Sequence, residues 1–131
     1  DYFRRFNSVN IPDLNHVLFD RNHFPKAKHI DSIYTVQKGI ASTVEQTLRF
    51  GEFPLVLAGD HSSAAATIAG IKAAYPHKTL GVVWVDAHAD IHSPYTTPSG
   101  NMHGMPLAIS LGDDNRQCQR NQPEPETEFF W

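Results

Sequence analysis

The stretch LGVVWVDAHADIHSP, residues 80–94, decides the fold. In it an apolar run is followed by a row of side chains that can bind a metal ion. The run 80–85 lacks alternation, which is typical of a strand buried on both faces of a parallel sheet. Asp86, His88, Asp90 and His92 then occupy every second position. Side chains two residues apart in an extended segment point to the same side. We therefore predict a buried strand that delivers Asp86, His88 and Asp90 to one point.

The residues before this stretch predict an α/β fold with a parallel sheet flanked by helices. A second unalternating apolar run, PLVLA at 54–58, is predicted as another buried strand. Helices are predicted at 31–51, from apolar residues at spacings of three and four, and at 62–76, where Ala and Gly allow close packing. A right-handed crossover places both strand ends at one sheet edge, where ligands bind. His61, in GDHS at 59–62, is therefore expected beside Asp86 and Asp90.

The remaining segments are predicted to be largely irregular. Residues 1–30 read as loops with one short element, and 93–106 as a long polar loop. A helix is expected to open in 106–115, and 115–128 is expected to be a surface loop. The terminal aromatics suggest an internal piece of a longer chain.

Composition limits the classes of function. The 131 residues suffice for one domain, and 40% apolar with 19% charged residues fits a globular protein. A net charge of −3 argues against general binding to nucleic acid or membrane surfaces. Cys118 has no second cysteine in this chain to pair with, which is compatible with a reducing compartment.

The predicted cluster of two carboxylates and two imidazoles favours a divalent cation. Two packed negative charges repel unless a cation lies between them. Oxygen and imidazole ligands without thiolate favour Mn²⁺, with Zn²⁺, Fe²⁺ and Co²⁺ as alternatives. A carboxylate can also bridge two ions about 3.5–4 Å apart that share and activate one water. The alternatives are a capping role for His61, an ordinary loop position for His92 and a backbone-binding role for Asp60.

The loop TTPSGNMHGMP, residues 96–106, offers further polar groups for a substrate. Ser99 and Asn101 have the chemistry to hydrogen-bond a polar head group, and His103 that of a proton shuttle. The alternative for each is a loop residue that satisfies its own backbone, an alternative favoured for Thr96 and Thr97.

Together GDHS, WVDAHADIHSP and TTPSGNMHGMP resemble the arginases of the ureohydrolase superfamily, over about residues 30–112. The resemblance implies an arginase-like three-layer α/β/α fold. It also implies hydrolysis of the guanidinium group of L-arginine to L-ornithine and urea by a metal-bridging hydroxide, with two Mn²⁺ ions.

The same resemblance assigns roles to individual residues. His61, Asp86 and Asp90 would hold one manganese, Asp86 would bridge to the second ion and His88 would ligate that ion. Asp90 and His103 are the predicted catalytic residues, His103 as the proton shuttle. The predicted substrate-binding residues, for the amino-acid end, are His92, Thr97, Ser99 and Asn101, with Thr97 the weaker contributor.

Two departures from the family pattern qualify these expectations. His92 stands where the family usually has asparagine, which bears on the exact guanidino substrate. The family's later D-x-D metal pair has no counterpart in this chain, so residues 1–131 are expected to be one incomplete catalytic domain, inactive alone. The full-length protein is expected to be a cytoplasmic homo-oligomer, a trimer or hexamer. The alternatives are an agmatinase or guanidinobutyrase, and a non-catalytic metal-binding fragment.

Overall fold

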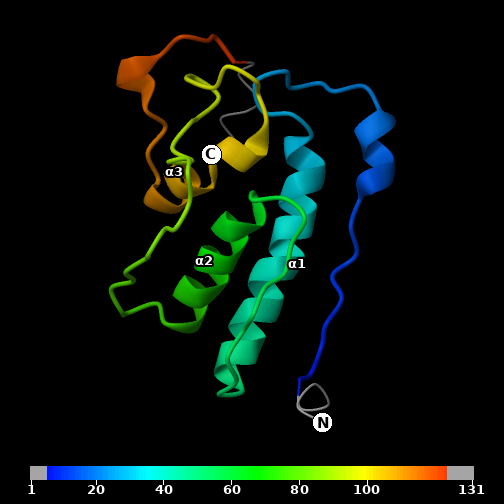
Figure 1. Ribbon diagram of the computed structural model, residues 1–131, viewed down its shortest axis with the longest axis vertical. Coiled ribbons are helices and arrows are strands. Elements are labelled where there is room, and N and C mark those ends of the chain that lie inside the picture. Colours follow the sequence, from blue (N-terminus) through cyan, green and yellow to red (C-terminus); the bar gives the residue numbers. More distant parts are fainter. Residues whose placement is uncertain (1–5, 124–131) are drawn as a thin grey trace.

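The computed structural model describes residues 6–123 and contains three α-helices and three short 3-10 helices within that range (Figure 1). The α-helices are α1 (Ile30–Arg49), α2 (Ser63–Ala74) and α3 (Pro106–Leu111). The 3-10 helices are η2 (Asn15–Phe19), η3 (Met102–Gly104) and η4 (Arg116–Cys118). None of the helices in this range is long and apolar enough to cross a membrane.

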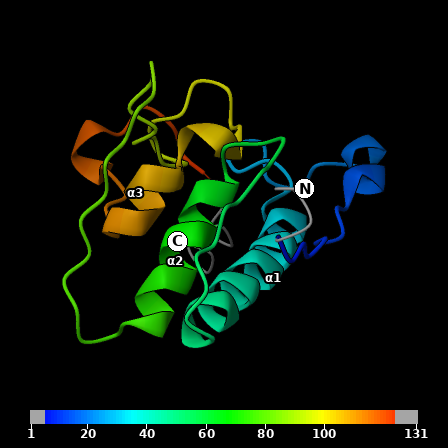
Figure 2. The same cartoon turned by 60° about the horizontal axis from the view of Figure 1, so that its bottom comes forward.

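Helices α1 and α2 lie side by side and form the main core, as both views show (Figures 1 and 2). The predicted apolar face of α1 is the face that packs, with Ile40 and Val44 buried against Ala66 of α2. Gly70 permits the close approach, because a Cβ there would lie 2.8 Å from the Cβ of Val44 and closer still to the α1 backbone. The prediction of a closely packing Ala- and Gly-rich helix is confirmed.

A second, smaller core connects the start of α1 to the segment before α3. Ala27 and Ile30 are buried against Met102 and Met105. The backbone N–H of Lys28 also donates to the carbonyl oxygen of Gly100, at 2.9 Å. This contact fixes the Gly100 end of the polar loop against residues 25–28.

The predicted strands at 54–58 and 80–85 are wrong for the described part of the chain, because residues 6–123 contain no β-strand. Both segments run extended along the helix pair, but no backbone hydrogen bond joins them to each other or to another described segment. A hollow of about 580 Å³ lies between them, lined by residues of both segments and of α2. A strand needs a neighbour for its N–H and C=O groups, and neither segment has one among these residues.

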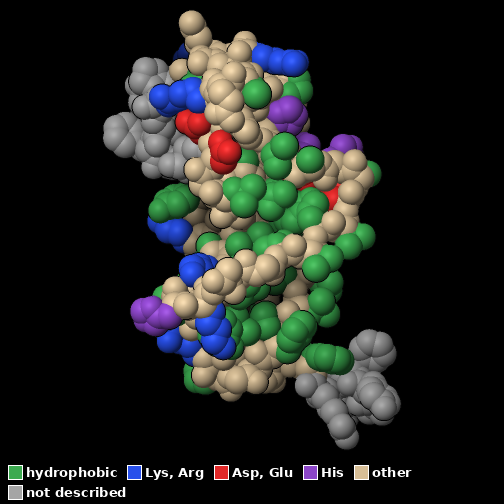
Figure 3. Space-filling view, turned by 90° about the vertical axis from the view of Figure 1, so that its left-hand side faces the viewer, with side chains coloured by type: hydrophobic (Ala, Val, Ile, Leu, Met, Phe, Trp, Pro, Cys, Tyr) green, Lys and Arg blue, Asp and Glu red, His purple; other side chains and the backbone are tan. Residues whose placement is uncertain are grey.

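The apolar side chains of these two segments are consequently exposed. Leu57 is 87% exposed, and Val83 and Val85 are more than 90% exposed, although each was expected inside a sheet. Figure 3, which shows the molecule from the left-hand side of Figure 1, has hydrophobic side chains gathered over the middle of the surface. The helices of the predicted three-layer fold are present, whereas the sheet that they would flank is absent from residues 6–123.

Candidate metal centre

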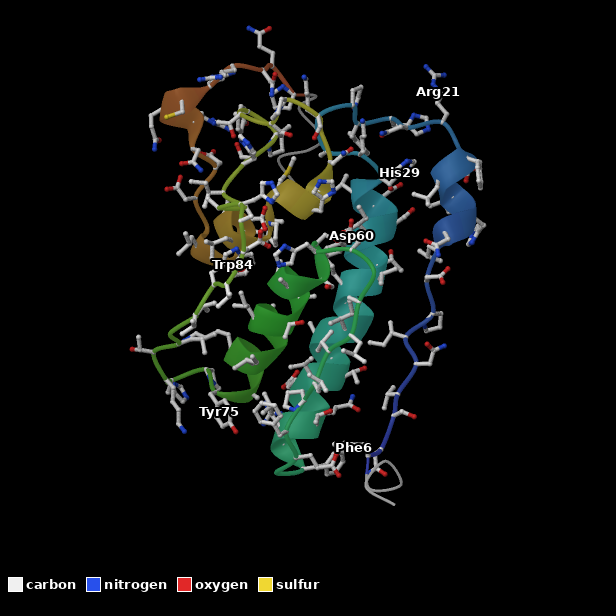
Figure 4. The ribbon with its side chains drawn as sticks, viewed as in Figure 1. Phe6, Arg21, His29, Asp60, Tyr75 and Trp84 are labelled. Carbon is white, nitrogen blue, oxygen red and sulfur yellow. The ribbon has the colours of Figure 1, made fainter. Side chains whose placement is uncertain are left out.

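His61, Asp86 and Asp90 converge at the N-terminal end of α2. The Nδ1 atom of His61 lies 3.1 Å from Oδ2 of Asp86 and 2.8 Å from Oδ2 of Asp90. One ligand atom from each of the three residues lies within 4.8 Å of the others. The predicted meeting of the GDHS and DAHAD motifs is therefore observed, at the end of α2 where Asp60 lies in Figure 4.

Local contacts around Asp60 hold His61 in this place. Oδ1 of Asp60 accepts a hydrogen bond from the N–H of Ser62 at 2.9 Å, which confirms that Asp60 binds loop backbone. The side chain of Gln37 in α1 donates to the carbonyl oxygen of Ser62, also at 2.9 Å. The His61 ring stacks on the Trp84 ring, with centroids 4.9 Å apart and an interplanar angle of 21°. These contacts orient the imidazole before any ion binds.

Asp90 is the most buried member of the cluster, with a side chain 7% exposed. Its φ of +50° is left-handed, a conformation that Asp tolerates better than most residues. Its carbonyl oxygen accepts hydrogen bonds from the N–H groups of Leu107 and Ala108, at 3.0 and 3.3 Å. The first turn of α3 therefore fixes the backbone from which this carboxylate projects.

Asp86 and His88 are arranged differently from the predicted alternation. The chain bends at residues 87–88, and the N–H of His88 donates to Oδ1 of Asp86 at 2.8 Å. The Nδ1 atom of His88 lies 3.4 Å from the same oxygen, but the side chain is 83% exposed. The strand that was predicted to align Asp86, His88 and Asp90 is absent, because the chain bends at residues 87–88, but His88 remains beside Asp86.

The pKa of Asp86 lies below its ordinary value of 3.8. The largest cause is the hydrogen bond from the His88 N–H, which stabilises the carboxylate. Partial desolvation opposes this effect, and the charges of His61 and His88 add to it. Asp86 is therefore ionised at neutral pH, as a metal ligand must be.

The three residues fit a divalent cation. The buried Oδ2 atom of Asp90 has no hydrogen bond among residues 6–123, since its approach to His61 lies outside hydrogen-bond geometry. One imidazole N–H cannot serve two carboxylates at once, so negative charge remains uncompensated. A cation among these atoms would compensate both carboxylates. Two oxygen ligands and one nitrogen ligand are compatible with Mn²⁺.

The other predicted residues lie on the loop 91–104. His103 is exposed, with Nδ1 3.7 Å from Oδ2 of Asp60, and Ser99 accepts a hydrogen bond from the N–H of Asn101 at 3.2 Å. Thr97 is buried, and its hydroxyl accepts a hydrogen bond from the Gly100 N–H at 3.0 Å. His92 is exposed, and its Nδ1 lies 3.2 Å from Oγ1 of Thr96.

Sequence reasoning missed the residues that support this loop from a distance. The Asn121 side chain donates to the carbonyl oxygens of Pro94 and Thr97, at 3.1 and 2.6 Å. The Asn115 side chain donates to the carbonyl oxygen of Ile91 at 2.6 Å. The segment 115–121 was predicted to be only a surface loop, and a polar composition carries no signal for such long-range contacts.

Comparison with known proteins gives a consistent family assignment. The family described as the Arginase family matches residues 2–121. An arginase of Brevibacillus brevis is 46% identical over 104 residues, which are 79% of this chain and 32% of that protein. An arginase of Bacillus caldovelox is 46% identical over 87 residues, which are 66% of this chain and 28% of that protein.

Solved structures agree with this assignment. A Bacillus cereus arginase matches 67% of this chain and 30% of its own, with 48% identity and a TM-score of 0.63. An Entamoeba histolytica arginase in complex with L-ornithine matches 82% of this chain and 35% of its own, with 31% identity and a TM-score of 0.69. The chain spans about a third of the length of the curated relatives that it matches. On this evidence the chain belongs to the arginase family.

Proposed function

We propose that this chain forms part of a longer arginase, which hydrolyses the guanidinium group of L-arginine to L-ornithine and urea. The observation that carries the proposal is the convergence of His61, Asp86 and Asp90, with a buried carboxylate oxygen that lacks a hydrogen bond. Relatives named arginases share 46% identity with this segment, which supports the choice of reaction.

We propose that the complete site holds two Mn²⁺ ions, which supply Lewis-acid activation of water when bound. His61, Asp86 and Asp90 would hold one ion, and Asp86 would also reach the second, together with His88. The 3.4 Å between Nδ1 of His88 and Oδ1 of Asp86 would allow these two residues to share an ion. The remaining ligands would come from parts of the enzyme outside these 131 residues.

The residues of loop 91–104 are proposed to bind substrate and move protons. His103 lies at the surface and beside Asp60, where an imidazole can exchange protons with solvent. Ser99, Asn101 and His92 would bind the amino-acid end of the substrate. Thr97 would be the weaker contributor, since its buried hydroxyl accepts a hydrogen bond from the Gly100 N–H and has one proton left to donate. We also propose that the full-length protein is a soluble, cytoplasmic homo-oligomer.

The test uses the full-length protein that contains this segment. Asp90→Asn should lower Mn²⁺ affinity, measured by titration calorimetry, by about tenfold or more, because a neutral amide is a poor ligand for a hard cation. Asp60→Asn is the matched control, since the Asp60 oxygen that binds Ser62 is retained as an amide oxygen. Equal Mn²⁺ affinity in the two variants would contradict the proposed site.

The substrate is tested separately by urea release from L-arginine and from agmatine. We expect turnover of arginine and little of agmatine, because agmatine lacks the carboxylate that Ser99, Asn101 and His92 would bind. Preferred turnover of agmatine would replace the arginase proposal by the agmatinase alternative. Mn²⁺ binding without turnover of any guanidino compound would support the non-catalytic alternative.

A further inference from the structure

Tyr95 is a buried residue in the middle of the loop 91–104. It lies in the sequence between His92 and Ser99, both of which are exposed and both of which are proposed to bind substrate. The neighbouring Pro94 is also buried, so this part of the loop packs against the protein while the parts on either side face solvent. The position of the Tyr95 side chain therefore bears on where both exposed residues lie.

The side chain of Arg116, in η4, contacts Tyr95 in two ways. Its Nη2 atom donates a hydrogen bond to the Tyr95 hydroxyl oxygen. Its guanidinium carbon lies 4.5 Å from the centre of the Tyr95 ring, a distance at which the ring attracts a cation. Oδ2 of Asp114 lies 3.2 Å from Nε of Arg116, and this ion pair orients the guanidinium group. The tyrosine is thus held by both a hydrogen bond and a charge.

The backbone of Tyr95 is bound by the same segment, 115–121. Its carbonyl oxygen accepts hydrogen bonds from the N–H groups of Arg120 and Asn121, at 2.8 and 2.9 Å. These bonds come from main-chain groups, so they are retained when the side chain of Arg116 is replaced. The side chain of Arg120 is exposed and makes none of the hydrogen bonds or ion pairs observed within residues 6–123. Arg120 therefore provides a matched control for the charge of Arg116.

We propose that Arg116 is a positioning residue, which clamps Tyr95 and so fixes His92 and Ser99 relative to each other before substrate binds. This inference rests on the proposed function, in which these two residues contact the amino-acid end of the substrate. A loop that is already ordered loses less conformational entropy on binding, which favours a low KM. The proposed metal ligands lie outside the loop 91–104, so the clamp acts on substrate binding and leaves Mn²⁺ affinity nearly unchanged.

The clamp is tested without turnover, by amide hydrogen exchange of the full-length protein loaded with Mn²⁺ and free of substrate. Arg116→Met keeps a long side chain but removes the charge and the donors to Tyr95. It should speed exchange in peptides from residues 91–104 about fivefold, the factor expected for one lost hydrogen bond. Arg120→Met removes the same charge from the same segment and should exchange at the native rate. Equal exchange in the two variants would overturn the clamp.

The consequence for binding is tested by kinetics with L-arginine and by calorimetric titration with Mn²⁺. Tyr95→Phe and Arg116→Met should each raise KM about twofold to tenfold, with kcat and Mn²⁺ affinity little changed. The double variant should resemble Arg116→Met alone, because the hydroxyl of Tyr95 then has no guanidinium donor to lose. Additive effects on KM, or an equal loss of Mn²⁺ affinity, would overturn the positioning role.

The two experiments separate this proposal from the proposed function. Absence of arginine turnover in the native full-length protein would contradict the arginase proposal, whereas the exchange rates report on the clamp whether or not arginine is the substrate. Faster exchange in Arg116→Met with a native KM would show that the clamp orders the loop without serving substrate binding, and would overturn the role proposed for it.

Discussion

Gly100 joins the loop 91–104 to residues 25–28, and its replacement by alanine tests this packing. Its φ is +76°, a left-handed conformation that costs a residue with a Cβ about 1–2 kcal/mol. A Cβ there would also lie 2.9 Å from the carbonyl carbon of Pro25 and overlap its oxygen. Relief of that overlap separates Gly100 from Lys28, whose N–H it binds at 2.9 Å.

These effects set the expected magnitude for Gly100→Ala. Overpacking costs about 1–3 kcal/mol and the lost hydrogen bond about 1 kcal/mol. With the about 1–2 kcal/mol for the left-handed backbone, we expect a total destabilisation of about 3–6 kcal/mol. Gly51→Ala is the matched control, because Gly51 has the same φ of +76° but no atom of residues 6–123 lies within 4 Å of its Cβ position. It should cost only about 1–2 kcal/mol.

The assay is urea unfolding of the full-length protein followed by circular dichroism, with KM for L-arginine measured in parallel. Gly100→Ala should also raise KM, because Ser99 and Asn101 flank the displaced residue. Equal destabilisation by the two glycine substitutions would refute the reasoning, since it would show that the contact with Pro25 carries no cost.

Two further predictions follow from the site and its supports. Asp86 has a lowered pKa in the folded state, so its contribution to stability is present above its ordinary value of 3.8 and is lost as pH falls below it. Without metal, Asp86→Asn should therefore show a smaller loss of stability between about pH 5 and pH 3 in urea unfolding, and an unchanged loss would contradict this. Asn121→Asp keeps the side-chain shape but removes the donors to Pro94 and Thr97, and should cost about 1–3 kcal/mol and raise KM for arginine. The exposed Gln122→Glu, at the neighbouring position, is its control, and the same loss there would show that charge alone is responsible.

Helices were the most predictable elements of this chain. The spacing of apolar residues predicted a helix at 31–51, and α1 spans Ile30–Arg49. The Ala-rich segment at 62–76 contains α2, Ser63–Ala74. Helices close their hydrogen bonds within the segment itself, so local sequence carries most of the information. The strands failed for the opposite reason, because their hydrogen bonds must come from a neighbour.

The candidate site was predictable in its composition but only partly in its geometry. The two motifs identified His61, Asp86 and Asp90, whose ligand atoms the structure brings within 4.8 Å. The bend at residues 87–88, which interrupts the extended segment at His88, was not visible in the alternating pattern. A period of two predicts a common side only where the backbone is extended throughout.

The sequence by itself determined the helices, the metal-competent residues and the resemblance to arginases, because each depends on residue types at short spacings. Tertiary structure alone decided the stacking of Trp84 on His61, the left-handed backbone at Asp90 and the support of the loop by Asn121. It also decided that the two apolar segments run unpaired in residues 6–123. These features join groups distant in sequence or depend on the surrounding packing, and no local pattern encodes them.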